Sequence, residues 1–202
     1  MMTRTRSAEE LTDPSRPGDM GRLIFTRGAA HLTIRVDGSM QDLCRSRFEG
    51  KAPDVRIDGS TVSVAYRWSL HPTRGELILS GRVPWVIEAG RGMSDVVADL
   101  DDLELKGLEV SGGASKIELR LPRPKDAVRV RIGAGASNVE LIRPTGVPVR
   151  VRIGGGTSKL AIDDLRLEAA GKTDWQSPDY DLVDGRYDVE IGGGASEVTV
   201  RT

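Results

Sequence analysis

The stretch Tyr187-Asp-Val-Glu-Ile-Gly-Gly-Gly-Ala-Ser-Glu-Val-Thr-Val200 decides the fold of this chain. Two short runs of alternating apolar and polar residues flank its glycine-rich centre, and alternation with a period of two predicts β-strands with one buried face. The pattern occurs four more times upstream, each time with a serine closing the glycine-rich segment. These serines are Ser94, Ser115, Ser137, Ser158 and Ser196, at steps of 21, 22, 21 and 38 residues.

A repeat of nearly constant length predicts a stacked array. Each unit combines a strand, a glycine corner, a second strand and a turn that contains proline or glycine. The corner residue before the serine is small in every unit except the one with Met93, as a crowded bend shared by stacked units requires. We therefore predict an all-β protein, a β-solenoid with repeats of about 21 residues. Hairpins joined at the glycines would instead give an antiparallel β-sandwich, and this alternative stays open.

The motifs of the last units carry a resemblance to a known family. They read Ile-Gly-Ala-Gly-Ala-Ser-Asn-Val-Glu-Leu (132–141), Ile-Gly-Gly-Gly-Thr-Ser-Lys-Leu-Ala-Ile (153–162) and Ile-Gly-Gly-Gly-Ala-Ser-Glu-Val-Thr-Val (191–200). This part of the chain, residues 83–202, resembles the toast-rack or adhesin-like β-repeat domains of bacterial proteins, as in the C-terminal part of LiaF-type envelope-stress regulators. The resemblance implies a stacked β fold, no known enzymatic activity and a link to the envelope-stress response.

The repeats also suggest how the chain is divided. Near its start the chain has too few apolar residues to bury, which predicts a flexible tail. The remainder is expected to form one elongated β-repeat domain, although its first third could be a separate small β domain. The expected segments are the tail (1–20) and the domain (21–202), which comprises degenerate first rungs and a cap (21–82), regular rungs (83–163), an insertion (164–186) and the last rung (187–202).

The composition of the chain indicates which classes of partner it can bind and in which cell compartment we expect it. The 29 basic and 30 acidic residues leave a net charge of −1, which gives no case for nucleic-acid binding. Cys44 has no second cysteine to pair with, so we expect it to be a buried core residue. No stretch approaches the roughly 20 apolar residues of a membrane span, and the N-terminus lacks the apolar region of a signal peptide. We expect a cytoplasmic protein without a membrane span.

The sequence predicts no catalytic, cofactor-binding or metal site. The glycine-rich segments lack the lysine of a phosphate-binding loop and lead into strands, not helices. The repeated serines lack a partner base, since His31 and His71 both lie outside the recurrent motifs. Asp99, Asp101 and Asp102 cluster in one turn but lack the spacing of calcium-binding repeats. A carbohydrate-active enzyme is a less favoured alternative, because it would need two carboxylates converging on one groove.

Parallel stacking would bring four arginines together. Equivalent outward positions read Glu88, Glu109, Arg131, Arg152 and Glu190 in one column. The neighbouring column reads Val86, Gly107, Arg129, Arg150 and Asp188. We predict a candidate interaction surface at Arg129, Arg131, Arg150 and Arg152, because guanidinium groups suit carboxylate or phosphate partners. In the alternative interpretation these arginines form ion pairs with the acids of neighbouring rungs.

Two further candidates are aromatic. Trp175 and Tyr180 lie in the segment 164–186, and either bind a partner or cover the open end of the array; we favour the second interpretation. We expect a protein-binding or regulatory platform whose partner is another protein. The alternative is a self-assembling scaffold that forms oligomers through its end strands. A valine at Gly135 or Gly155 would damage the corner if these glycines hold positive φ.

Overall fold

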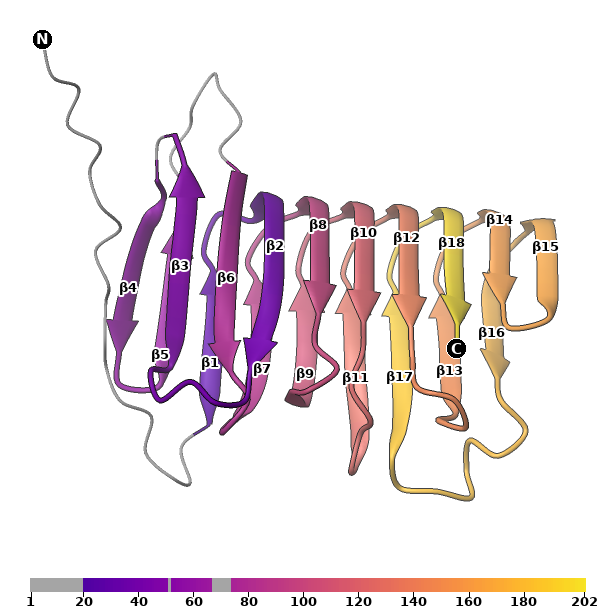
Figure 1. Ribbon diagram of the computed structural model, residues 1–202. Coiled ribbons are helices and arrows are strands. Elements are labelled where there is room, and N and C mark those ends of the chain that lie inside the picture. The colour runs from indigo at the N-terminus through magenta and orange to yellow at the C-terminus, as the bar shows by residue number, and fades with distance from the viewer. Residues whose placement is uncertain (1–19, 51, 67–73) are drawn as a thin grey trace, which may run out of the picture.

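The computed structural model of the chain describes residues 20–50, 52–66 and 74–202. The expected flexible tail, apart from Met20, and His71 lie outside the described residues. The described residues form strands and no helix, and thus no helix that could cross a membrane. Two nine-stranded sheets face each other along an elongated array (Figure 1).

The first sheet runs in the order β16 (Thr173–Gln176), β13 (Val149–Ile153), β17 (Arg186–Ile191), β11 (Ala127–Ile132), β9 (Glu104–Val110), β7 (Pro84–Ala89), β1 (Gly21–Phe25), β5 (Thr61–Ala65) and β4 (Asp54–Asp58). The second sheet runs in the order β15 (Leu165–Ala170), β14 (Thr157–Ile162), β18 (Ala195–Arg201), β12 (Ala136–Ile142), β10 (Ala114–Arg120), β8 (Met93–Asp99), β2 (Ala29–Asp37), β6 (Arg74–Ser80) and β3 (Cys44–Glu49).

The predicted β-solenoid is confirmed. The two strands that flank a glycine corner, such as β11 and β12, belong to different sheets and therefore do not form a hairpin. Each pairs in parallel with the equivalent strand of the next rung, so that Ala114 lies opposite Ala136 and Ile117 opposite Val139. The antiparallel β-sandwich is wrong for this chain. Antiparallel pairing occurs only where the outermost strands β3, β4, β15 and β16 meet their neighbours, among the strands that the structure describes.

The order of the rungs in space differs from their order in the chain. The pair β17–β18 lies between β11–β12 and β13–β14, and the pair β1–β2 lies between β5–β6 and β7–β8 (Figure 1). Beyond β13–β14 the chain turns back at Asp163-Asp164 and forms the reversed rung β15–β16. At the other end β3–β4 is reversed in the same way. Both the first and the last rung of the chain are therefore third from an end of the array.

The corner glycines are required by close approach between rungs. A Cβ atom at Gly155 would lie 2.7 Å from the backbone nitrogen of Gly194, and one at Gly135 would lie 3.1 Å from the Gly194 oxygen. The expectation of positive φ at Gly135 and Gly155 is wrong, because neither has a φ in the left-handed region. Hydrogen bonds continue around the corner, as from Ala134 N to Gly112 O at 3.1 Å.

Positive φ occurs instead at the residue that follows each of the five aligned serines, and at His31, which follows Ala30 at the equivalent position. Six rungs share this feature, and the residues are His31, Asp95, Lys116, Asn138, Lys159 and Glu197, with φ between 50° and 54°. The interstrand pairing passes over this residue, as between Ser115–Ser137 and Ile117–Val139. Two consecutive side chains therefore point outward, which is a β-bulge repeated along one face of the array.

Valine, isoleucine and leucine fill the space between the sheets. Trp85 and Tyr187 are the largest fully buried side chains, and each has a hydrogen bond to a backbone oxygen, of Ser80 at 2.8 Å and of Pro122 at 2.6 Å. Cys44 is 3% exposed, and burial raises the pKa of its thiol to about 12. Cys44 is thus a neutral core residue.

Candidate functional site

The predicted arginine columns are interrupted by β17. The column order was wrong at its last two positions: Glu190 lies between Arg131 and Arg152, because β17 is inserted between β11 and β13. In the neighbouring column Asp188 likewise separates Arg129 from Arg150. The structure therefore places an acidic strand between the two arginine strands, and the four arginines do not form one continuous patch.

Each of these arginines is paired within the protein. Arg131 contacts Glu109 at 2.9 Å and Glu190 at 3.5 Å. Arg152 contacts Asp188 at 2.8 Å and Glu190 at 3.6 Å, and Arg150 contacts Asp174 at 2.6 Å. A hydrogen bond from Arg129 is the main cause that lowers the pKa of Glu190. This ladder of internal ion pairs leaves little free charge for an external partner.

The structure places Trp175 on the outermost strand and Tyr180 in the loop that leads to β17. Trp175 belongs to β16, lies opposite Val151 of β13 and packs against the core. Tyr180 is 8% exposed, and the Arg186 guanidinium lies 5.2 Å from the centre of its ring. Both aromatic side chains therefore contact the rest of the protein, and their role as a cover of the array stays a prediction.

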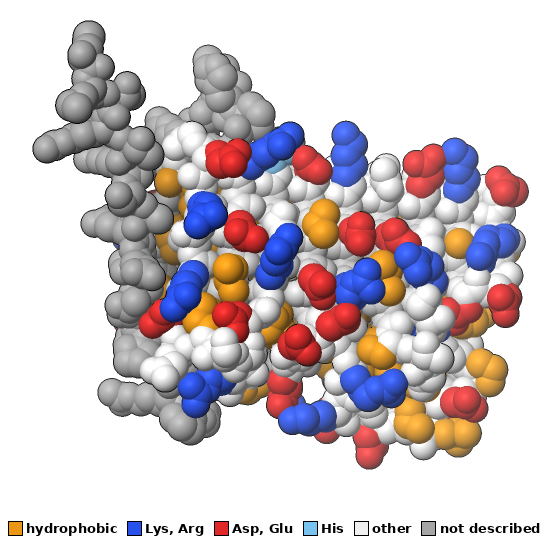
Figure 2. Space-filling model, viewed as in Figure 1, with side chains coloured by type: hydrophobic (Ala, Val, Ile, Leu, Met, Phe, Trp, Pro, Cys, Tyr) orange, Lys and Arg blue, Asp and Glu red, His pale blue; other side chains and the backbone are white. Residues whose placement is uncertain are grey.

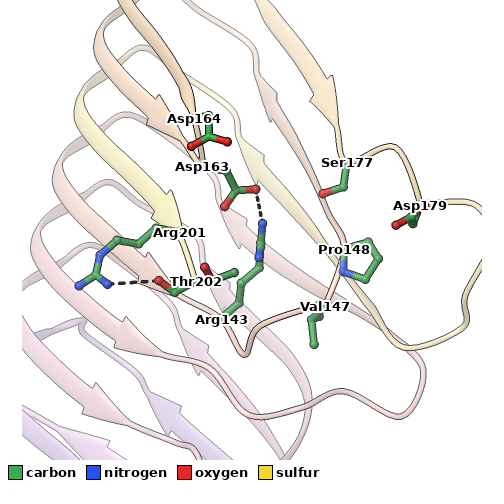
Figure 3. A pocket seen from close by; sticks show the side chains of 10 residues that line it. Arg143, Val147, Pro148, Asp163, Asp164, Ser177, Asp179, Arg201 and Thr202 are labelled. Carbon is green, nitrogen blue, oxygen red and sulfur yellow. Dashed lines mark hydrogen bonds and ion pairs between the residues drawn. The ribbon is translucent and has the colours of Figure 1, made fainter.

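A pocket that the sequence did not indicate lies where the chain skips a rung (Figure 3). Its volume is about 470 Å³, and we call it the crossover pocket. Its walls come from the connection between β12 and β13, the turn after β14, the segment after β16 and the end of β18. The lining residues are Arg143, Gly146, Val147, Pro148, Asp163, Asp164, Ser177, Asp179, Arg201 and Thr202.

The pocket follows from the rung order. The segment 143–148 must pass the place of β17 and β18 before β13 begins, and this detour leaves a hollow that the segment after β16 borders on its other side. Gly146, with a φ of 77°, and Pro148 give the detour its bent course. Pro148 accepts a hydrogen bond from the Tyr187 backbone nitrogen at 3.0 Å, and Ser177 Oγ accepts one from Val149 at 3.0 Å.

Arg143 is the most buried charged group of the pocket. The residue is 6% exposed and its guanidinium reaches past the end of β18 to Asp163 (Figure 3). Burial lowers the pKa of Arg143, and the charge and hydrogen bond of Asp163 partly offset this. The Arg143 Nε is buried without a hydrogen-bond partner among the described residues. Arg201 is occupied differently, by Glu140 at 2.5 Å and by the backbone oxygen of Thr202.

Two carboxylates of the pocket have no such partner. Asp164 and Asp179 are exposed, and neither forms an ion pair or side-chain hydrogen bond with a described residue. Asp164 belongs to the turn after β14, whereas Asp179 belongs to the opposite wall with Ser177 (Figure 3). The pocket therefore combines a paired arginine at its base with two free acids at its walls.

An exposed apolar segment adjoins the pocket. Leu182 and Val183, in the connection between β16 and β17, are 77% and 42% exposed. Across the described residues the other large exposed apolar side chains are Met20 and Val97. Charged side chains of both signs are mixed over the face seen in Figure 2, and apolar side chains gather at its lower right edge, where this connection runs in Figure 1. We call residues 177–185 the acidic–apolar loop, because it also carries Asp179, Asp181 and Asp184.

Comparison with known proteins supports the class of the fold. Residues 45–142 match the family described as the N-terminal domain of toast_rack. A crystal structure described as a "putative cell adhesion protein" from Clostridium sporogenes aligns with a TM-score of 0.70 and 19% sequence identity, covering 96% of this chain and 99% of that chain. No functionally curated protein matches the chain. The chain is therefore similar to toast-rack domains over residues 45–142, which overlap the segment 83–202 where the resemblance was placed, and the structural likeness supports the stacked β fold.

Proposed function

We propose that the protein is a non-catalytic protein-binding platform that binds through the crossover pocket and the acidic–apolar loop. The observation that carries this proposal is the contrast between two surfaces. Leu182 and Val183 are exposed in the same loop as the unpaired carboxylate of Asp179, whereas the arginines of β11 and β13 are engaged by acids of β9, β16 and β17. Exposed apolar side chains with a polar rim are characteristic of protein interaction sites.

Site-specific photo-crosslinking tests this proposal. A benzophenone amino acid replaces Leu182 in the intact protein, and the matched control carries it at Val97, which is also exposed but lies on β8. Irradiation of cells that make the protein should give a defined higher-mass adduct from position 182 and none from position 97. Adducts of equal yield from both positions, or from position 97 alone, would contradict binding at this site.

We further propose a regulatory role in the envelope-stress response, which the family resemblance supports, and a location in the cytoplasm. This part of the proposal rests on the motifs of residues 132–200 and on the single, buried Cys44, which needs no oxidising compartment. Identification of the cross-linked protein tests the role, and fractionation of the cells tests the location. A partner outside envelope homeostasis, or recovery outside the cytoplasm, would contradict them.

A self-assembling scaffold is the second candidate function. The observation that favours it is that β4 and β16 end one sheet, and β3 and β15 the other, each with one side that no described strand pairs. Light scattering during size exclusion over a hundredfold concentration range tests this candidate. A mass that rises above 21.8 kDa with concentration supports end-to-end assembly, and a constant 21.8 kDa rules it out.

A further inference from the structure

We infer that the crossover pocket receives a basic side chain, lysine or arginine, from an extended segment of a protein partner. Apolar residues next to that side chain would rest on Leu182 and Val183. This inference rests on the proposed function and names the chemistry of the partner.

The charged side chains of the pocket determine whether it attracts a positively or a negatively charged ligand. Arg143 is paired with Asp163, and Arg201 with Glu140, so both cations are already engaged. Asp164 and Asp179 keep their charges free on opposite walls. A cationic side chain in the pocket would be attracted by both carboxylates, whereas an anion would be repelled by both.

Arg143 favours a peptide over a simple cation. Its Nε is a buried donor without a partner among the described residues, and an unsatisfied buried donor is unfavourable. A small organic cation brings no acceptor for it. A peptide brings backbone carbonyl oxygens together with its basic side chain, and a carbonyl oxygen would bond to Nε once a shift of the Arg143 side chain uncovers this enclosed atom.

The loop beside the pocket also suits a peptide that carries basic and apolar residues. Leu182 and Val183 offer apolar surface in the loop that forms one wall of the pocket, and Asp181 and Asp184 add negative charge to the same loop. The volume of about 470 Å³ lies within the range of small-ligand pockets and accommodates a long side chain. The complementary segment is therefore one in which basic and apolar residues alternate.

The probe is an acetylated and amidated pentapeptide, Leu-Lys-Gly-Arg-Leu, titrated into the ¹⁵N-labelled full chain and followed by NMR. We expect saturable shifts at residues 143, 164, 179 and 182. The double variant Asp164→Asn, Asp179→Asn should bind about tenfold more weakly, since two carboxylate contacts are lost. The matched control, Asp58→Asn with Asp102→Asn, removes two exposed acids elsewhere and should bind like the wild type. The spectrum of each variant shows whether it is folded.

The alternative outcomes separate the inference from the proposed function. If the charge-reversed peptide Leu-Glu-Gly-Asp-Leu shifts the same residues and the basic peptide does not, the inference fails and binding at this site stands. If spermidine shifts them as strongly as the basic peptide, recognition of a peptide fails. Absence of binding by the basic peptide overturns the inference, and crosslinking at position 182 then tests the site independently. Equal weakening by both double variants would also overturn it, because binding would then depend on net charge alone.

Discussion

At the scale of single residues, the repeated bulge is the most unusual backbone feature. The six residues of this bulge hold the left-handed conformation although none is glycine, and left-handed backbone costs an L-residue about 1–2 kcal/mol. The conformation lets the serine and the following residue both point outward while the next apolar residue returns to the core. The bulge thus sets the phase of each second strand relative to its corner.

Lys116 offers the cleanest test of this strain, because it forms no ion pair with a described residue. Lys116→Gly should raise the free energy of unfolding by about 0.5–1 kcal/mol, since glycine adopts positive φ without steric cost. Lys116→Val should lower it by about 1 kcal/mol or more, because β-branched residues fit this region worst. Urea midpoints give the order, and a valine variant as stable as the glycine variant would show that φ carries no strain.

Gly155 tests the close contact between corners. Gly155→Val should lower stability by about 1–3 kcal/mol, because its Cβ would lie 2.7 Å from backbone of the neighbouring rung. Gly171 is the matched control, since a Cβ there meets nothing within 4 Å and its φ is not in the left-handed region. Thermal unfolding of both variants measures the difference. Equal melting temperatures would mean that the corners can move apart.

At the scale of elements, β17 holds the arginine strands β11 and β13 apart. Parallel neighbours place equivalent residues opposite each other, so direct contact between β11 and β13 would align Arg129 with Arg150 and Arg131 with Arg152. Like charges opposite each other destabilise a sheet. The acids Asp188 and Glu190 of β17 instead face arginines on both sides. Charge complementarity therefore favours the observed strand order.

The effect of Glu190→Gln on the free energy of unfolding should depend on pH if charge complementarity stabilises this strand order. The pKa of Glu190 is lowered from 4.5, first by the hydrogen bond from Arg129. A carboxyl group with a lowered folded pKa contributes stability above its unfolded pKa and loses it as pH falls through the folded value. The variant should be about 1 kcal/mol less stable at pH 7, and the difference should shrink below about pH 4.5.

The measurement is the urea midpoint at pH 7 and pH 3, with Glu168→Gln as the control. Glu168 is exposed on the edge strand β15 and forms no ion pair with a described residue, so its substitution should matter little at either pH. A Glu190→Gln deficit that persists undiminished at pH 3 would assign the effect to packing, not to charge.

Elements were predictable from the sequence where the pattern is local. Alternation such as Val128-Arg-Val-Arg-Ile132 indicates a strand, and the repeated serine gives the rung length. The neighbour of each strand was harder to predict, because β13 and β17 have the same apolar pattern and fit the same places. The signal that was available is the charge: an acidic strand fits between two basic ones. The crossover pocket depends on that order and so was missed with it.

At the scale of the whole molecule, both ends of the array have the same construction. A reversed rung is outermost, and the first or last rung of the chain is third from the end. The β17–β18 pair has paired strands on both sides, and the Tyr187 hydroxyl donates a hydrogen bond to the backbone oxygen of Pro122. The chain termini of the domain therefore lie inside the stack, not at its ends.

Two deletions test this arrangement. Removing residues 187–202 should leave β11–β12 and β13–β14 without the rung between them, expose their apolar faces and abolish cooperative unfolding. Removing residues 104–125, one internal unit, should leave a shorter array in which β7–β8 stacks on β11–β12. Calorimetry with dye binding to exposed apolar surface distinguishes the two. A cooperative transition in the first variant would show that the last rung behaves as a dispensable terminal repeat.

The interior position of the first and last rungs restricts how such an array can change length during evolution. A repeat duplicated before β1 or after β18 would not lengthen the array, because β1–β2 and β17–β18 each have a rung on both sides and the outermost places are held by reversed strands. Growth or loss must occur by tandem duplication or deletion within residues 84–142, where order in the gene and order in space agree. Homologous arrays of different length should therefore keep both ends and differ in the middle.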